Sequence, residues 1–348
     1  MSSNTATQQP SYKVAIIGVE TILGQEVLNH LHERSFPVSA LKIAGEDKNQ
    51  LKQMSFGDDT LQMIHADTMN MDGFDVVFLT GTEYVAKKII QKLENSDAKI
   101  IDLTDTDGKL LAIPDLGYAP SKTAKIIASP SSATIQLVST LKALEEIGTI
   151  ETVTVSTYHS VSEVGRPAMD ELFNQVRTIY MNQEPKTQHF SKHIAFNVIP
   201  QVGGFEDNHA TGAEHAIITE TASLMESEPK VAATCVYTPV FVGHGQSVTV
   251  QFKDTISVKD IKAAWRASEG IEIIDLESEM EFVTPSEIHG ETNVFLSRIR
   301  ANEGIDNSLS YWSVMDNLQS GAAYNSVRIA ESILGVESPA EISSIDDE

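Results

Sequence analysis

The feature that most constrains the fold is a regular alternation of short apolar runs and helical patterns in the first half of the chain. Residues 13–17 (KVAII) predict a strand whose apolar run, 14–17, ends at Gly18, and residues 85–93 (VAKKIIQKL) form a helical pattern. Continuous apolar runs indicate strands buried on both faces, and their alternation with helices favours a parallel sheet covered by helices on both sides. The other predicted strands are residues 41–44, 75–79, 99–101 and 125–128.

The pattern changes near residue 150. Residues 152–158 (TVTVSTY) alternate with a period of two, and residues 232–242 and 247–252 indicate two long neighbouring strands. A further strand is predicted at 293–298. Few helical patterns separate these strands, which favours an α+β domain built on a mixed or antiparallel sheet. Residues 320–334 form the last helical pattern, and we expect this C-terminal helix to pack back on the first domain.

Composition excludes several classes of protein. The length of 348 residues and the apolar share of 41% favour a globular chain of about two domains. The net charge of −24 repels phosphate backbones and makes nucleic acid a poor partner. A single cysteine, Cys235, excludes an internal disulfide framework and a thiolate zinc cluster. We also expect no membrane span, no signal peptide in the polar residues 1–13, and a cytoplasmic location.

The ten histidines show no metal-ligand spacing along the sequence. His189 and His193 are four residues apart, but no carboxylate–histidine motif flanks them. The sequence therefore predicts no metal site.

A glycine-containing turn follows the first predicted strand. Residues 18–24 (GVETILG) open a helix, and Gly18 and Gly24 stand where a dinucleotide-binding turn needs a tight bend and close backbone approach to pyrophosphate. Thr21 occupies a position where glycine normally permits that approach, and Glu20 adds negative charge beside it. The turn predicts a Rossmann-like fold and leaves cofactor binding open. Asp47, after the second strand, could accept hydrogen bonds from a ribose and would repel a 2′-phosphate, which disfavours NADP relative to NAD.

Six later segments carry a family resemblance. In this order and at these intervals they resemble aspartate-semialdehyde dehydrogenase, over about residues 12 to 335: 128–136 (ASPSSATIQ), 156–162 (STYHSVS), 168–172 (AMDEL), 196–201 (FNVIPQ), 239–244 (PVFVGH) and 315–323 (MDNLQSGAA). The resemblance implies an enzyme that reduces β-aspartyl phosphate with NADPH, as a dimer or tetramer. It implies a cysteine nucleophile that forms a thioester, and a histidine that acts as general acid and base.

The resemblance also implies a domain division. Residues 12–130 would form the Rossmann-like domain, completed by about 320–336, and residues 131–319 would form the dimerisation and substrate domain. We expect residues 1–11 and 338–348 to be disordered tails.

Of the residues at the family's catalytic positions, Ser132 and His159 are substituted and His244 is retained. Ser132 stands at the nucleophile position, and a serine hydroxyl is too weakly acidic for a helix N-terminus to activate it as it activates a thiol. The alternative for Ser131 and Ser132 is helix capping, which serine does well. His244 matches the general acid/base, and His159 replaces a glutamine. Cys235 lies in an apolar run and is expected to be a buried structural thiol.

The implied binding positions are substituted as well. Tyr237 replaces an arginine that would grip a carboxylate with two hydrogen bonds, and Gly108 replaces another arginine. Ala213 and Ala216 replace a glutamate and a lysine, with Glu214 left between them. Glu163 replaces a glycine of the cofactor loop and, with Glu20 and Asp47, disfavours NADP. The candidate substrate residues are Ser131, Glu214 and Tyr237, and the candidate cofactor residues are Gly18, Thr21, Gly24, Asp47, Gly81, Ser162, Gly165 and Asn317.

Three functions fit these substitutions. The leading hypothesis is a catalytically impaired relative, similar to the Usg proteins, that acts as a homodimeric binding or regulatory protein for a small-molecule metabolite and binds NAD(P) weakly or not at all. The alternative is an active NAD(P)-dependent oxidoreductase on an aldehyde or acyl substrate in amino-acid biosynthesis. The third is a hydrolase in which His244 or His159 activates Ser132.

Overall fold

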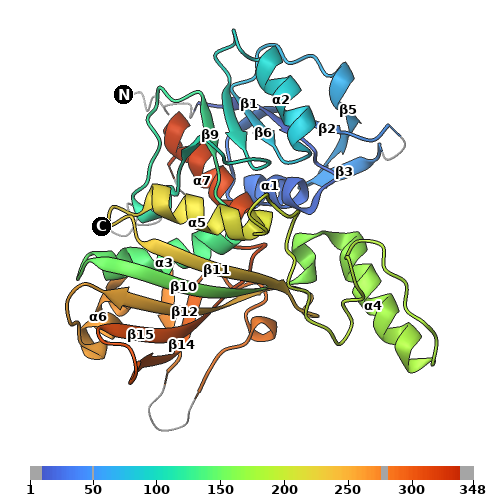
Figure 1. The fold of residues 1–348 in the computed structure, drawn as a ribbon. Helices are drawn as coiled ribbons and strands as arrows, with labels where there is room; N and C mark the ends of the chain where they lie inside the picture. Colours follow the sequence, from blue (N-terminus) through green and yellow to red (C-terminus); the bar gives the residue numbers. More distant parts are fainter. Residues whose placement is uncertain (1–9, 49–50, 276–280, 338–348) are drawn as a thin grey trace, which may run out of the picture. The chain divides into compact units, whose positions relative to one another are not determined.

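The computed structural model describes residues 10–48, 51–275 and 281–337, so residues 1–9 of the predicted tail 1–11 and the whole predicted tail 338–348 lie outside the described residues. The chain divides into two compact units (Figure 1). Unit 1 comprises Met1–Leu110, Ala119–Ser129 and Ser326–Glu348. Unit 2 comprises Leu111–Tyr118 and Pro130–Asn325.

Unit 1 contains a parallel sheet, as the alternation of runs predicts. In the described residues the sheet has seven strands in the order β5-β2-β1-β6-β7-β9-β8, and β1, β2, β5, β6, β7 and β9 pair in parallel. The strands are β1 (Tyr12–Ile17), β2 (Val38–Gly45), β5 (Ile64–His65), β6 (Val76–Leu79), β7 (Lys99–Asp102), β8 (Leu110–Leu111) and β9 (Ile126–Ala128). A separate hairpin joins β3 (Gln53–Phe56) and β4 (Asp59–Gln62).

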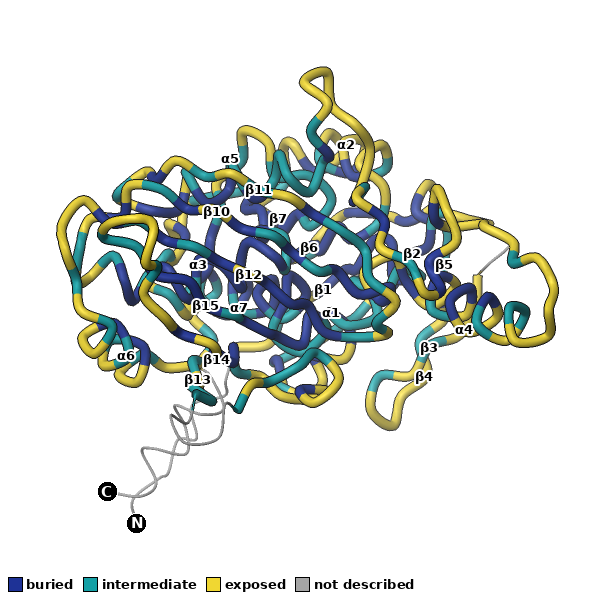
Figure 2. Tube along the Cα trace, turned by 60° about the horizontal axis from the view of Figure 1, so that its bottom comes forward, coloured by how far each residue is buried: buried dark blue, intermediate teal, exposed yellow. Residues whose placement is uncertain are grey.

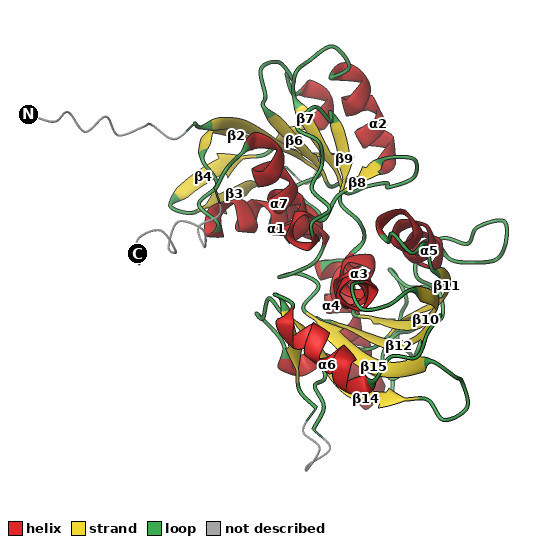
Figure 3. Cartoon of the chain, turned by 90° about the vertical axis from the view of Figure 1, so that its left-hand side faces the viewer, coloured by secondary structure: helices red, strands yellow, loops and turns green. Residues whose placement is uncertain are grey.

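Helices cover both faces of this sheet. Figure 3 shows α2 (Glu83–Lys92) on one face and α1 (Ile22–Glu33) on the other. Ala86, Ile89 and Leu93 of the α2 segment pack on the strands in one buried cluster. All four residues of β6 are buried, which explains why this strand has no alternating pattern.

The end of helix α7 (Ala322–Leu334) belongs to unit 1 and packs beside α1. The Arg34 guanidinium binds the buried Glu331 carboxylate through two hydrogen bonds, of 2.7 and 2.9 Å. The Tyr12 hydroxyl donates to the Leu334 carbonyl at 2.9 Å. These contacts confirm that the C-terminal helix packs back on the first sheet, because a bidentate buried pair fixes its orientation.

Unit 2 is built on a mixed sheet, as predicted. In the described residues it has six strands in the order β11-β10-β12-β15-β14-β13. The β10–β11 and β13–β14 pairs are parallel, and the β10–β12, β12–β15 and β14–β15 pairs are antiparallel. The strands are β10 (Ile150–His159), β11 (Lys230–Tyr237), β12 (His244–Phe252), β13 (Ile271–Ile273), β14 (Val294–Ala301) and β15 (Ser308–Met315).

One strand prediction is wrong in length and placement. The run at 232–242 was expected to continue as one strand beside 247–252, but β11 ends at Tyr237, and residues 238–243 form the loop before β12. Pro239 lies in this loop and has no N–H to continue a ladder. The two strands are also not adjacent, because β10 lies between them.

Helices cover the core side of the unit 2 sheet. Buried Trp265 of α6 (Val258–Ala267) donates from Nε1 to the Thr140 carbonyl of α3 (Ser132–Glu145) at 2.9 Å. Its ring contacts Tyr311 of β15 edge-on, with centroids 4.9 Å apart. The remaining helices are α4 (Arg166–Tyr180) and α5 (Gly212–Leu224). Figure 2 shows buried residues along β10, β12 and β15, and exposed residues around α4.

None of the helices in the described part of the chain is both long and apolar enough to span a membrane.

Candidate functional site

Two histidines meet where neighbouring strands of unit 2 end and begin. His159 is the last residue of β10, and His244 is the first residue of β12. The two strands are antiparallel, with Tyr158 opposite Gly245, so the histidines lie at the same edge of the sheet. Their ring centroids are 4.7 Å apart and both residues are 1% exposed. The geometry therefore brings together the two histidines that the sequence singled out.

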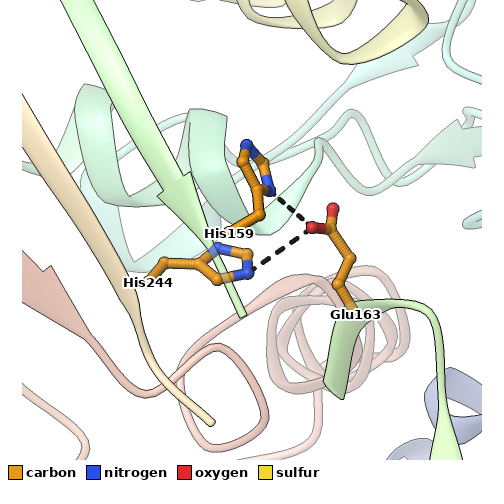
Figure 4. Close-up of side chains that lie close together, drawn as sticks. All are labelled: His159, Glu163 and His244. Atoms are coloured by element: carbon orange, nitrogen blue, oxygen red, sulfur yellow. Dashed lines mark hydrogen bonds and ion pairs between the residues drawn. The ribbon is translucent and has the colours of Figure 1, made fainter. Parts of the chain in front are cut away.

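A carboxylate completes the cluster. Glu163 lies in the short turn Val161–Glu163 that follows β10, and its side chain turns back toward the strand end. Its Oε2 is 2.5 Å from Nδ1 of His159 and 3.6 Å from Nε2 of His244 (Figure 4). The Glu163 side chain is 33% exposed, so the cluster is reached from solvent through this residue. The other ring nitrogen of His159, Nε2, is 2.7 Å from the Thr157 hydroxyl.

Burial and pairing set the charges of the cluster. Burial lowers the pKa of His159, but the Glu163 carboxylate, together with the neighbouring Cys235, outweighs this effect and raises that pKa to about 10. Burial raises the pKa of Glu163, and the charge and hydrogen bond of His159 bring it down to about 2. Burial lowers the pKa of His244 to about 4, against the attraction of Glu163. At neutral pH the cluster therefore holds an ion pair beside a neutral imidazole.

His244 makes the fewest hydrogen bonds of the three residues in the cluster. Among the described residues, neither of its ring nitrogens has a hydrogen-bond partner. A buried polar group without a partner costs about 1–3 kcal/mol, so such a group calls for an explanation.

Ser132 does not join the histidines. Ser131 is the N-cap of α3, since its Oγ accepts from the Thr134 N–H at 3.2 Å, and it also donates to the Glu220 carboxylate at 3.0 Å. The Ser132 Oγ instead accepts from the N–H of Ala322, the first residue of α7, at 3.1 Å. In the described part of unit 2 no hydrogen bond connects Ser132 to His159 or His244, so the geometry gives the serine no positioned base.

The other candidate substrate residues have structural partners. Glu214 forms a capping box with Thr211 at the start of α5, and its second oxygen accepts from the Cys235 N–H at 3.1 Å. Tyr237 packs edge-on against His159, with centroids 6.1 Å apart, and burial and the Glu163 carboxylate raise the pKa of its phenol. Cys235 is fully buried, as expected, and its thiol interacts with His159.

Two candidate cofactor residues of unit 2, Ser162 and Asn317, are buried in one hydrogen-bond network. The Asn317 side-chain oxygen accepts from the Gly243 N–H at 3.0 Å and from the hydroxyls of Ser160 and Ser162 at 3.2 and 3.3 Å. Gly165 precedes α4 with a φ of +112°, a conformation that favours glycine. The side chains of Ser162 and Asn317 are therefore hydrogen-bonded to each other.

In unit 1, hydrogen bonds of the Thr21 hydroxyl stabilise the glycine-containing turn. Its hydroxyl donates to the Gly18 carbonyl at 2.8 Å and accepts from the Gly24 N–H at 3.0 Å, so Thr21 caps α1. Gly18 has a φ of +89°, and a Cβ there would lie 2.3 Å from the Gly81 nitrogen. Close approach of the two loops therefore requires glycine at position 18.

Carboxylates line the same strand ends. Glu46, directly after β2, accepts from the Thr82 N–H at 2.7 Å and from the Thr82 hydroxyl at 2.8 Å, at the N-terminus of α2. Glu20 accepts from the Glu46 N–H at 2.5 Å. Asp47, which the sequence favoured, is exposed one residue further on. The sequence pattern missed Glu46 because β2 extends to Gly45, one residue beyond the predicted strand.

The comparisons with known proteins decide the family. The family model described as "Semialdehyde dehydrogenase, NAD binding domain" matches residues 13–106, and the one described as "Semialdehyde dehydrogenase, dimerisation domain" matches residues 141–320. The aspartate-semialdehyde dehydrogenase of Rickettsia conorii is 34% identical over 330 residues, which are 93% of this chain and 98% of the relative. The chain belongs to the aspartate-semialdehyde dehydrogenase family. The family's enzyme from Aquifex aeolicus is 32% identical, covering 92% of this chain and 97% of the relative.

Solved structures of the family agree. Aspartate semialdehyde dehydrogenase II of Vibrio cholerae, complexed with ASA, matches with a TM-score of 0.87 and 28% identity, covering 94% of this chain and 99% of that one. The Candida albicans aspartate semialdehyde dehydrogenase with NADP has a TM-score of 0.68 at 20% identity and supports the fold alone; that match covers 94% of this chain and 99% of that one. The resemblance stated from the sequence is therefore confirmed for the family, and the similarity to Usg proteins stays a prediction.

Proposed function

We propose that this member of the aspartate-semialdehyde dehydrogenase family does not carry out the family's cysteine-dependent reaction and acts as a homodimeric binding or regulatory protein for a small metabolite. The observation that carries the proposal is the pairing of Glu163 with His159 beside His244. An ion pair therefore stands beside the expected acid/base residue, at positions where the resemblance implies an uncharged glutamine and a glycine.

The nucleophile position supports the same proposal. Ser132 has no hydrogen-bonded base among the described residues, and its Oγ is engaged by the Ala322 N–H. A hydroxyl needs such a base, whereas a thiol at a helix N-terminus ionises near neutral pH. Tyr237, where the resemblance implies an arginine, offers one hydroxyl in place of a charged bidentate donor.

The unit 1 turn argues against NADP. Glu20 and Glu46 direct carboxylates at the strand ends, with Asp47 beside them. The 2′-phosphate of NADP would meet these negative charges, so the residues present do not fit that group. The ribose hydroxyls of NAD could donate to Glu46, but Glu46 would first have to release Thr82. We therefore propose weak NAD binding or none.

Two measurements on the full-length protein test the proposal. Turnover of aspartate semialdehyde with phosphate and either NAD or NADP should be undetectable under conditions in which the Rickettsia conorii relative is active. Calorimetric titration with NAD, NADH and NADPH should give no binding or weak binding. A hydride-transfer rate near that of the relative would overturn the proposal.

The alternative is an active oxidoreductase with another substrate. Retention of His244 in a buried site that Glu163 opens to solvent favours it. Strong, saturable binding of NAD or NADH would support this alternative. Sedimentation analysis tests the expected homodimer, which the matched dimerisation domain supports.

A further inference from the structure

We infer that His159, Glu163 and His244 form a binding site for one divalent transition-metal ion, with Zn²⁺ as the reference ion. The inference goes beyond the proposed function and does not depend on it. Each of the three residues offers one ligand atom, and these atoms all lie within 4.8 Å of one another. The spacing of histidines along the chain gave no sign of this set, because the three residues come from two strand ends and a turn.

The donor chemistry suits such an ion. Two imidazoles and one carboxylate are a frequent set for catalytic Zn²⁺ and for non-haem Fe²⁺, whereas Mg²⁺ and Ca²⁺ prefer oxygen ligands. Three protein ligands leave coordination positions for water or for an exogenous anion. Because the Glu163 side chain is 33% exposed, an ion can enter from its side.

Two of the ligand–ligand distances lie on either side of the separation in a metal site, and all three ligand atoms lie within 4.8 Å of one another. Bonds of about 2.0–2.1 Å in a tetrahedral centre place ligand atoms about 3.3 Å apart. Oε2 of Glu163 is 2.5 Å from Nδ1 of His159 and 3.6 Å from Nε2 of His244. An ion would widen the first separation modestly, and Glu163 is the least buried of the three and the easiest to shift.

The surroundings orient His159 for this role. The Thr157 hydroxyl lies 2.7 Å from Nε2 of His159 and can accept a hydrogen bond from the Nε2–H, so that Nδ1, once an ion has displaced its proton, presents its lone pair to that ion beside Glu163. Metal-ligating histidines commonly have such a partner on the second ring nitrogen.

His244 distinguishes a metal site from a simple ion pair. A His159–Glu163 pair satisfies those two residues and leaves both nitrogens of a 1% exposed imidazole without a hydrogen bond among the described residues. An ion bound between the three side chains uses the free lone pair of His244 as well. The metal site therefore accounts for all three residues.

The test is a titration of the chelator-treated, full-length protein with Zn²⁺ in competition with a chromophoric chelator. We expect one high-affinity ion per chain. His244→Gln and Glu163→Gln should each weaken binding by at least 100-fold, and Thr157→Val by about 10- to 100-fold. Co²⁺ should give a visible absorption spectrum of nitrogen and oxygen coordination that the His244→Gln protein lacks.

A matched control uses the exposed pair His189 and His193. The double variant His189→Ala/His193→Ala should retain the affinity and the Co²⁺ spectrum. Circular dichroism shows whether each variant is folded. Absence of a high-affinity ion in the wild-type protein, or equal affinity in folded Glu163→Gln and His244→Gln proteins, would overturn the inference. Dehydrogenase activity would overturn the proposed function and leave this site untouched.

Discussion

The carboxylate of Glu163 lies 2.5 Å from the imidazole of His159, four residues earlier in the chain. The contact exists because β10 ends at His159 and the chain turns at once through Val161–Glu163. His244, from the start of β12, faces the same carboxylate (Figure 4). A position that the family resemblance gives to a glycine thus supplies the charge that organises the cluster.

Restoring the nucleophile alone should not restore the family's reaction. Ser132→Cys places a thiol at the first residue of α3, where the helix N-terminus favours its ionisation. We expect no turnover of aspartate semialdehyde, because the His159–Glu163 ion pair and Tyr237 still occupy the positions that the resemblance gives to substrate- and cofactor-binding residues. Spectrophotometric assay with NAD and NADP checks this. Turnover by the single variant would show that the serine is the sole defect.

Gly321 should not tolerate a side chain. A Cβ at this position would lie 2.2 Å from the Asn317 carbonyl oxygen and 2.3 Å from the Ser132 Oγ. We expect Gly321→Ala to lower the free energy of unfolding by about 1–3 kcal/mol. Gly304→Ala is the control, since nothing lies within 4 Å of a Cβ there. Denaturant unfolding of the two variants compares them, and equal stabilities would contradict the contact with Ser132.

The Arg34–Glu331 pair should contribute substantially to the stability of unit 1. Glu331 is 1% exposed, so Arg34→Met leaves a buried carboxylate with Arg328 as its other arginine contact. We expect a loss of about 2–4 kcal/mol, since breaking a buried pair is costly. Arg166→Ala breaks an exposed pair with Asp170 and should cost less than about 1 kcal/mol. Hydrogen exchange in α1 and α7 would localise the effect.

The ion pairs of Lys109 with Asp102 and Asp105 predict a pH dependence of stability. Burial raises the pKa of Asp105, but the Asp107 N–H and Lys109 outweigh burial and lower it below its ordinary value of 3.8. A lowered carboxyl pKa in the folded state stabilises the protein above the ordinary pKa, and this contribution is lost as the pH falls through the lowered value.

Lys109→Met tests that dependence. The variant should be less stable than the wild-type protein near neutral pH, because Lys109 also pairs with the buried Asp102 at 2.8 Å. The difference in denaturation midpoint should shrink as the pH falls through the acidic range in which Asp105 is protonated. A difference that stays constant down to acid unfolding would contradict the assigned pairing.

The sequence predicted the layers of the fold well, because burial on one or both faces of a strand leaves a direct pattern. The apolar run at 14–17 became the buried part of β1, and the alternating run at 152–158 became β10. The error at 232–242 arose where hydrophobicity continued past Tyr237 into a loop. The apolar pattern at 232–242 indicates which residues are apolar, whereas the end of β11 depends on where its hydrogen bonds to the neighbouring strand stop.

The sequence by itself determined the family and the parallel and mixed sheets, and it identified Ser132 and His244 as candidate site residues. Only the tertiary structure decided which of these residues meet. It placed Glu163 beside His159 and His244, and it placed the Ser132 hydroxyl in a hydrogen bond with the Ala322 N–H at the start of α7. Local apolar periodicity encodes which faces are buried, whereas contacts between side chains distant in sequence depend on strand register and turn geometry. For that reason the cluster could not be found from spacing along the chain.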